Sequence, residues 1–301
     1  MTATTADSRR LGAILCMIGS AACWGLGTVM TKAVLADLPP FTTLALQLSA
    51  SVAVLWLAVL ATRQRLPARP VRTAMSGLLE PGLAYGVGVP GLALTSAASA
   101  SVIAASEPAV VILIAALFLR DRPTPRVVAA VFVAMAGVVL VTLGGSTAEV
   151  STGGGAERTL AGDALIFLGV VFAALYVLSS SHLVQRTDPL ILSALQQSAG
   201  LVLALILLGA ALVTGWERLP EPSFEALLAA LGSGVVQYAL AFWLYLRGMR
   251  HVPVQTAALF LTLTPVFGVG GALVFLGETM TALQWLGSLL VVGTLVALAR
   301  R

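Results

Sequence analysis

Two apolar stretches decide the fold of this chain: Ser106–Asp121, SEPAVVILIAALFLRD, and Leu263–Glu278, LTPVFGVGGALVFLGE. When one is laid over the other, Pro108 falls on Pro265 and the closing acidic residues coincide. Each stretch is a long apolar run with one proline, and a threonine follows its closing acidic residue three positions later. The chain therefore contains an internal repeat.

Arginines near these stretches indicate how each copy is oriented. The first copy ends among Arg120, Arg122 and Arg126, whereas no basic residue follows the second until Arg300. Arginine beside a membrane segment marks the cytoplasmic side. We therefore expect the two copies to enter the membrane in opposite directions. An inverted repeat with interrupted helices is an architecture of secondary transporters.

The composition predicts an all-α integral membrane protein. Of the 301 residues, 58% are hydrophobic and 10% are charged, whereas a soluble domain carries about 25% charged residues. So few charged side chains cannot cover a folded chain in water. Uninterrupted apolar runs favour helices over the alternating strands of a β-barrel. The net charge of +4 does not indicate a nucleic-acid partner, because the arginines are scattered singly between apolar runs.

Ten apolar segments have about the 20 residues that cross a bilayer. With the N-terminus placed in the cytoplasm, 14 of the 17 basic residues fall in inner loops or ends, which predicts that both termini are cytoplasmic. The predicted spans are residues 11–33, 42–62, 74–94, 98–119, 124–144, 161–182, 190–214, 224–246, 253–276 and 281–299.

A glycine-rich stretch at 153–155 separates two sets of five spans. Because five is an odd number, the second set must enter the membrane upside down relative to the first. We predict that residues 1–147 form one five-helix repeat, that 148–160 connect, and that 161–301 form the second, inverted repeat.

Three short motifs resemble the EamA-type drug/metabolite transporter superfamily, and the resemblance covers nearly the whole chain through its ten-span plan. A departure lies at residues 120–121, where a Gly-Glu pair is common in the family. The resemblance implies a carrier in a bacterial-type inner membrane that exports metabolites, with amino-acid exporters, including those for aromatic amino acids, as the nearest functional match. The motifs are Cys23-Trp24-Gly25, Glu107-Pro108 with Thr264-Pro265, and Phe275-Leu276-Gly277-Glu278.

Polar and aromatic residues inside the apolar runs are the candidates for a substrate cavity. An ionisable group in hydrocarbon is costly and usually faces a cavity or a partner. Aromatic surface beside polar atoms suits an amino acid with an apolar or aromatic side chain, although each aromatic also has packing between helices as an alternative. The candidates are Trp24, Thr28, Glu80, Glu107, Tyr176, Gln237, Tyr238, Tyr245, Phe260 and Thr264.

Glu80 and Glu107 are the two carboxylates placed well inside spans. They are candidates to bind a substrate ammonium or to carry a coupling proton, and the structural alternative is to pair with Lys32, which otherwise reaches water from the outer end of its helix. Pro108 and Pro265 each remove a backbone hydrogen bond within a span, so we expect hinges there.

Other signals are excluded. A GxGxxG match at residues 86–91 lies inside an apolar span with no strand before it, so it does not indicate a dinucleotide site. The chain has no P-loop, HExxH or paired CxxC motif, so we expect no ATP-driven pumping, no cofactor and no metal. No catalytic cluster is found, so we expect no enzyme.

The sequence thus predicts a secondary transporter that exports small metabolites, most of all amino acids of broad specificity including aromatic ones, by alternating access. The alternative is a multidrug or nucleotide-sugar exporter of the same superfamily. Facilitated diffusion and proton coupling both stay open. The expected partners are the lipid bilayer and a small-molecule substrate, and a monomer is expected.

Overall fold

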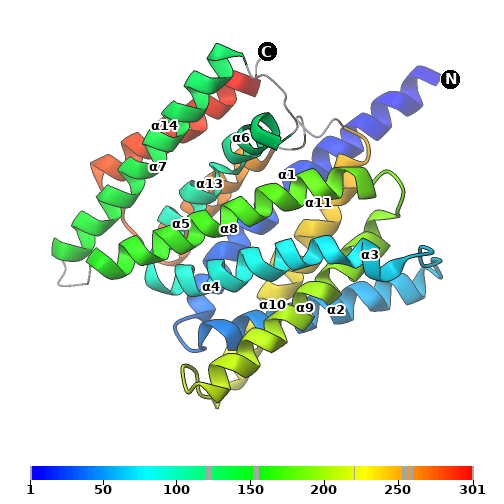
Figure 1. Cartoon of the computed structure of the whole chain (residues 1–301), viewed down its shortest axis with the longest axis horizontal. Helices are drawn as coiled ribbons and strands as arrows, with labels where there is room; N and C mark the ends of the chain where they lie inside the picture. The colour runs from blue at the N-terminus through cyan, green and yellow to red at the C-terminus, as the bar shows by residue number, and fades with distance from the viewer. Residues whose placement is uncertain are drawn as a thin grey trace.

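The chain is described by a computed structural model over residues 2–118, 124–151, 156–219, 221–252, 257 and 260–299. Every regular element in these ranges is a helix, and none of them contains a strand (Figure 1). The all-α prediction is confirmed for this part of the chain. The expected departure at 120–121 and the connecting glycines at 153–155 lie outside the described residues.

The helices fall into an earlier and a later set along the chain, here called the first half and the second half. The earlier set is α1 (Thr2–Val34), α2 (Pro40–Ala61), α3 (Pro70–Ala74), η1 (Met75–Leu78), η2 (Leu79–Leu83), α4 (Ala84–Leu94), α5 (Ala97–Ala104), α6 (Glu107–Phe118) and α7 (Pro125–Ser151). The later set is α8 (Ala156–Leu183), α9 (Pro189–Val213), α10 (Phe224–Gly234), η3 (Val235–Leu240), α11 (Ala241–Met249), η4 (Leu261–Leu263), α13 (Thr264–Phe275) and α14 (Ala282–Ala299).

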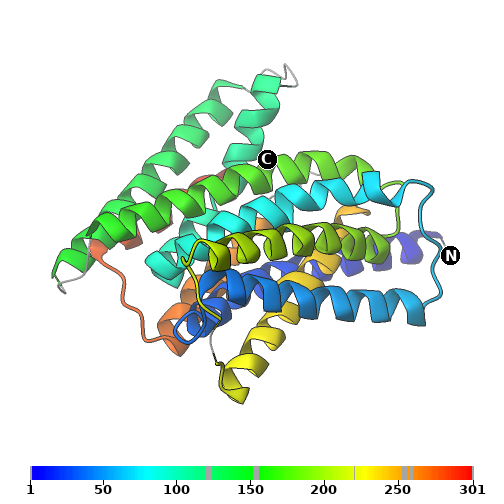
Figure 2. The ribbon, with the colours of Figure 1, turned by 60° about the horizontal axis from the view of Figure 1, so that its bottom comes forward.

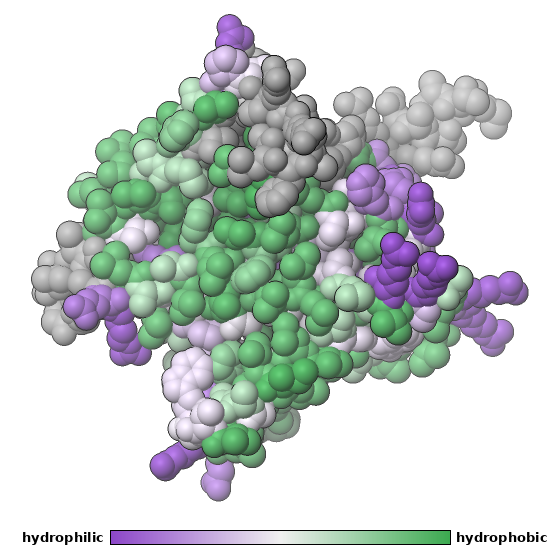
Figure 3. All heavy atoms as spheres, in the orientation of Figure 1, coloured by the Kyte–Doolittle hydropathy of each residue, from purple (hydrophilic) through white to green (hydrophobic). Residues whose placement is uncertain are grey.

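Within the described part, six stretches are long and apolar enough to cross a membrane, and apolar side chains cover most of the face shown in Figure 3, with hydrophilic ones toward its edges. The predicted count of ten spans stays a prediction. The six are Leu11–Val34, Pro40–Ala61, Ala97–Ile114, Glu157–Leu183, Pro189–Val213 and Phe224–Met249, and the shorter apolar helices are Val128–Gly144, Thr264–Phe275 and Ala282–Thr294.

Two of the expected spans are interrupted in the first half. Glu80 has an extended backbone, with φ −147° and ψ 124°, so the expected span 74–94 is continuous helix only after it. The expected span 98–119 is two helices, α5 and α6, and Pro108 is the second residue of α6. This corrects the expectation of a proline within a helix: proline is accommodated in a first turn because the N–H it lacks would have no helical partner there.

The second half is irregular at the matching positions. Gln237, which the repeat places on Glu80, lies in η3, a π-helix. Pro265, which the repeat places on Pro108, lies in the first turn of α13, directly after the 3₁₀ turn η4. Short π-helical turns occur often at functional sites. The irregular backbone therefore follows the internal repeat.

Helices of the two halves pack against one another in pairs. α1 packs on α11 and α13, α8 packs on α4 and α6, α2 packs on α9, and α7 packs on α14. Figures 1 and 2 show α2 and α9 side by side and running in opposite directions. The core therefore forms between the halves rather than within each of them.

The tightest backbone contacts between the halves are those of two glycines that lie against two glutamines. A Cβ on Gly77 would collide with the backbone carbonyl of Gln196, and a Cβ on Gly234 would collide with that of Gln47. The same glutamines bridge the halves through their amides. Gln47 Nε2 donates to Ser233 Oγ at 2.8 Å, and Gln196 Nε2 donates to Ser76 Oγ at 2.8 Å.

Two carboxylates of the second half cap helices of the first. Glu217 accepts hydrogen bonds from the backbone N–H groups of Phe41 and Thr42, at 2.7 and 3.1 Å. Glu278 accepts from those of Ala97 and Ala98, at 2.8 and 2.9 Å. A carboxylate at a helix N-terminus satisfies free donors and interacts favourably with the helix dipole. These contacts hold the starts of α2 and α5 to the second half.

Replacing Gly234 with alanine should destabilise the protein, because the added methyl group must displace backbone. Overpacking of this kind costs about 1–3 kcal/mol. Gly232 lies in the same helix with nothing within 4 Å of its missing Cβ, so Gly232→Ala should leave stability unchanged or raise it by up to about 1 kcal/mol. Thermal unfolding in detergent measures both, and equal melting temperatures for the two variants would contradict the contact.

Candidate functional site

A cavity of about 130 Å³ lies inside the bundle, between the two halves. A single water needs only about 10–15 Å³, so the cavity has room for several waters or for a small solute. Its walls come from α1, η2, α4, α5 and α6 of the first half, and from α8, η3, α11, η4 and α13 of the second. Both interrupted regions of each half therefore contribute to it.

Eight of the ten predicted residues line this cavity, and two do not. Tyr238 is fully buried behind the wall, where its ring packs edge-on against Tyr85 at 4.7 Å between centroids. Phe260 is partly buried against the central core. The structure thus differs from the expectation at these two positions. The eight are Trp24, Thr28, Glu80, Glu107, Tyr176, Gln237, Tyr245 and Thr264.

Several lining residues were missed from the sequence. Tyr85 lies on α4 with Gly88, Val89 and Leu92, at spacings of three, four and seven that place all four on one helix face. Thr31 follows Thr28 by three positions and Trp24 by seven, so the same periodicity identifies it. Small residues on other helices complete the wall, among them Ala100, Ala104, Gly169 and Ala173.

Aromatic rings form one wall of the cavity. Trp24 packs edge-on against Phe242 and Tyr245, with centroids at 5.1 and 5.2 Å. Tyr176 packs on the same Phe242 at 5.8 Å. Edge-to-face packing of this kind fixes ring positions and adds stability beyond the buried area. The wall is therefore a rigid aromatic surface contributed by α1, α8 and α11.

Two donors in the lining have no partner among the described residues. The indole N–H of Trp24 and the hydroxyl of Tyr245 are buried and make no hydrogen bond there. Buried polar groups are nearly always paired, so such groups in a cavity wall are suited to a ligand or to water.

The cavity is acidic. Glu80 and Glu107 both line it and lie close enough to interact electrostatically. Neither carboxyl group makes a hydrogen bond or an ion pair with another described residue, and no lysine, arginine or histidine is among the lining residues that the structure describes. A carboxylate that lacks a protein counter-charge at this depth is suited to a cationic group or a proton.

Lys32 is partly exposed near the end of α1. Its Nζ donates to the backbone carbonyls of Leu92 and Thr95, at 2.9 and 2.6 Å, and so satisfies the end of α4. Because the side chain is partly exposed, the expectation that it reaches water stays a prediction. The lysine therefore fastens α1 to α4.

Hydrogen bonds connect the cavity wall to the contacts between the halves. Thr31 Oγ1 donates to Gln237 Oε1 and accepts from Gln47 Nε2 at 2.8 Å. In the aromatic wall, Tyr176 donates its hydroxyl to Gln196 Oε1 at 3.0 Å. Gln47 and Gln196, which lie against glycines of the other half, therefore also hold Thr31 and Tyr176 in the cavity wall.

The described residues contain no group of three or more potential metal ligands. The chemistry of the site is therefore that of carboxyl, hydroxyl, amide and indole groups on an apolar surface. A bundle of membrane-length helices whose interruptions meet at such a cavity is the architecture of a polytopic membrane carrier.

A family model described as the EamA-like transporter family matches residues 11–143 and 160–300. The chain therefore belongs to the EamA-like transporter family, a group of membrane transporters in the drug/metabolite transporter superfamily, and is a multi-pass membrane protein. A solved structure titled only "Crystal structure of protein" matches 98% of each chain with a TM-score of 0.66 and 22% identity, which shows a shared fold. No curated protein matches the sequence.

Thr31→Val should destabilise the ligand-free protein, because one amide N–H of Gln47 and the amide oxygen of Gln237 each lose the hydrogen bond that they make with Thr31. Each unpaired group costs about 1–3 kcal/mol. The hydroxyl of Thr28 donates only to the carbonyl of Trp24 in its own helix, so Thr28→Val is the matched control and should unfold within about 0.5 kcal/mol of the wild type. Equal destabilisation of both variants in thermal unfolding would argue against the network.

Proposed function

We propose that this protein is a secondary transporter that exports small metabolites, foremost amino acids of broad specificity. One observation carries the proposal: a cavity between the halves brings two carboxyl groups together with an aromatic wall. A substrate ammonium would bind Glu80 or Glu107, and an apolar or aromatic side chain would lie on the rings. The donors of Trp24 and Tyr245, which make no hydrogen bond with a described residue, would bind the substrate carboxylate.

We further propose that the chain crosses a bacterial-type inner membrane ten times, with both termini in the cytoplasm. Residues 1–147 and 161–301 would be the two inverted repeats, and 148–160 would connect them. The matched irregularities at Glu80 and Gln237 support this plan. So do the matched glycine contacts and the antiparallel packing of α2 and α9.

Alternating access follows if the halves rock about the cavity. The proposed hinges are Pro108 and Pro265, each in the first turn of the second segment of an interrupted helix. The carboxylates of Glu217 and Glu278 hold helix starts of the first half to the second half. If the cavity opens at the starts of α2 and α5, the hydrogen bonds that these helices make with Glu217 and Glu278 must break. A proton would compete with a substrate ammonium for Glu80 and Glu107, so both coupled and facilitated transport fit the site.

Gly88→Leu should abolish flux while preserving the fold. Gly88 lines the cavity, and nothing lies within 4 Å of its missing Cβ, so a leucine side chain would occupy substrate space. Gly209 is likewise open but lies on the exposed face of α9, away from the cavity lining. Counterflow of radiolabelled amino acids in proteoliposomes should therefore be lost in Gly88→Leu and kept in Gly209→Leu. If no amino acid shows saturable counterflow in the wild type, the proposed substrate class is wrong.

A second candidate is export of cationic drugs. The described lining residues include no basic side chain that would repel a cation, and the two carboxyl groups are sufficient to bind one. Both features favour this candidate. The same absence disfavours nucleotide-sugars, because a diphosphate is usually bound by arginine or lysine.

Glu107→Gln separates the two candidates. If amino acids are the substrates, losing the charged partner of their ammonium should lower flux roughly 10- to 100-fold, the equivalent of about 1.5–3 kcal/mol. If cationic drugs are the substrates, the variant should lose drug resistance while amino-acid flux stays intact. The exposed Glu225 at the start of α10 provides the control, and Glu225→Gln should change neither activity.

A further inference from the structure

A second hollow, of about 370 Å³, lies at one end of the bundle. It is formed where α2 ends, where α9 begins and where α11 ends, and it shares no lining residue with the central cavity. The lining residues are Thr62, Gln64, Asp188, Pro189, Leu190, Trp243, Arg247, Arg250 and His251.

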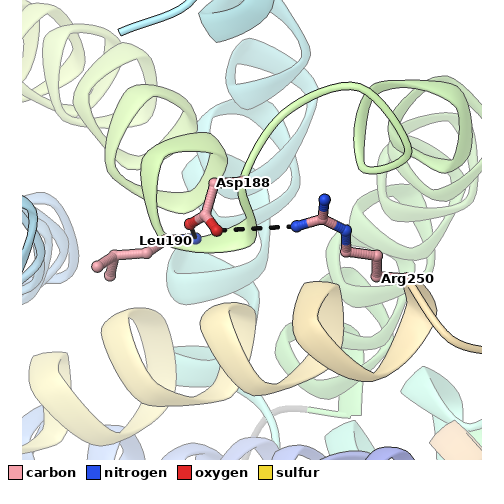
Figure 4. A network of polar contacts seen from close by, with 3 residues as sticks. All are labelled: Asp188, Leu190 and Arg250. Carbon is pink, nitrogen blue, oxygen red and sulfur yellow. Dashed lines mark hydrogen bonds and ion pairs between the residues drawn. The ribbon is translucent and has the colours of Figure 1, made fainter. Parts of the chain in front are cut away.

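The hollow carries an excess of cationic groups that a single carboxylate does not neutralise. Asp188 Oδ2 lies 3.7 Å from Arg250 Nη1, and the two side chains are 40% and 41% exposed, respectively. The other oxygen of Asp188 accepts from the backbone N–H of Leu190 at 2.9 Å, which caps α9 (Figure 4). A guanidinium has five N–H donors, so this long contact leaves Arg250 able to bind a second anion.

Arg247 is positioned by an aromatic ring. Its guanidinium carbon lies 5.3 Å from the centroid of the Trp243 ring, a cation–π contact. This contact restricts the guanidinium and leaves its N–H groups free at the edge, where arginine binds phosphate through two parallel hydrogen bonds. Both arginines border the same hollow and so can bind one phosphate group.

Two apolar side chains continue from this hollow along the end of η3 and the start of α11. Leu240, the last residue of η3, is followed by Trp243 and Arg247 at spacings of three and four, which place the three on one side of the helix. Leu240 is 38% exposed. An apolar residue, an indole and a guanidinium in this order match the acyl chain, the interface and the headgroup of a phospholipid.

We propose that this hollow binds the phosphate of an anionic phospholipid headgroup, with Arg247 and Arg250 as the donors and an acyl chain along the face that carries Leu240 and Trp243. Arg63 and Arg65 follow α2 at the same end of the bundle, the end that the positive-inside rule assigns to the cytoplasm. Anionic lipids concentrate in that leaflet. The bound lipid would join the end of α2, the start of α9 and the end of α11, and its binding does not depend on which substrate is transported.

Titration of the purified full chain with phosphatidylglycerol in mixed micelles tests this assignment, with the melting temperature as the readout, because a ligand of the folded state raises apparent stability. Phosphatidylglycerol should raise the melting temperature saturably, and phosphatidylcholine should not. Arg247→Gln combined with Arg250→Gln should raise the half-maximal phosphatidylglycerol concentration by about tenfold or more, since each arginine near anionic lipid contributes roughly fivefold. Arg72 is exposed on α3 and outside the hollow, so Arg72→Gln should titrate like the wild type.

Three results would overturn the proposal: an unchanged titration in the double variant, an equal shift with phosphatidylcholine, or the same stabilisation from inorganic phosphate alone, which would assign the hollow to free phosphate. Arg250→Lys keeps the charge and loses the planar pair of donors, so it serves if the double variant does not fold. It should retain less phosphatidylglycerol than the wild type in native mass spectrometry, and equal retention would count against the site.

Discussion

The structure depends on a close backbone approach between the halves, at Gly77 on Gln196 and at Gly234 on Gln47. Only a residue without a Cβ permits this approach, and the approach places each glutamine amide beside a serine of the other half. In a membrane there is little hydrophobic drive between apolar helices, so close packing of small residues and hydrogen bonds between helices hold a bundle together. Here both occur at the same two places.

The cavity follows from that constraint. Each glycine lies three residues before an irregular position, Gly77 before Glu80 and Gly234 before Gln237. Irregular backbone at membrane depth is tolerated where protein buries it or where it lines a cavity. Glu80 and Gln237 line the cavity at these interruptions. Gln47 is connected to the cavity wall by its hydrogen bond to Thr31. Packing and cavity chemistry are therefore coupled through the same side chains.

The sequence predicted the helical class and most of the cavity because polar, charged and aromatic side chains stand out within apolar runs. It did not identify the small residues of the wall, since an alanine such as Ala104 looks the same toward a cavity as toward lipid. Tyr238 lies outside the cavity lining and next to Gln237 in the π-helical turn of η3, a backbone irregularity that the sequence pattern does not indicate. The partners of Lys32 lie about 60 residues away at the end of α4, and no local pattern reveals them.

The interruptions were also only partly predictable. Pro108 and Pro265 indicated where the helices are irregular, but the choice between a kinked helix and a new helix depends on tertiary packing. The structure starts a new segment at each proline, so the residues before it are held by neighbouring helices rather than by one continuous ladder of hydrogen bonds.

If two halves of opposite orientation enclose the cavity, two corresponding loops must lie on opposite sides of the membrane. Arg65 follows α2 and Arg218 follows α9, and both are exposed. Single cysteines at these positions, in a chain with Cys16 and Cys23 replaced, can be labelled on intact cells with a membrane-impermeant maleimide. The account predicts that Arg218→Cys reacts from outside and that Arg65→Cys reacts only after permeabilisation. Reaction of both cysteines from the same side would contradict it.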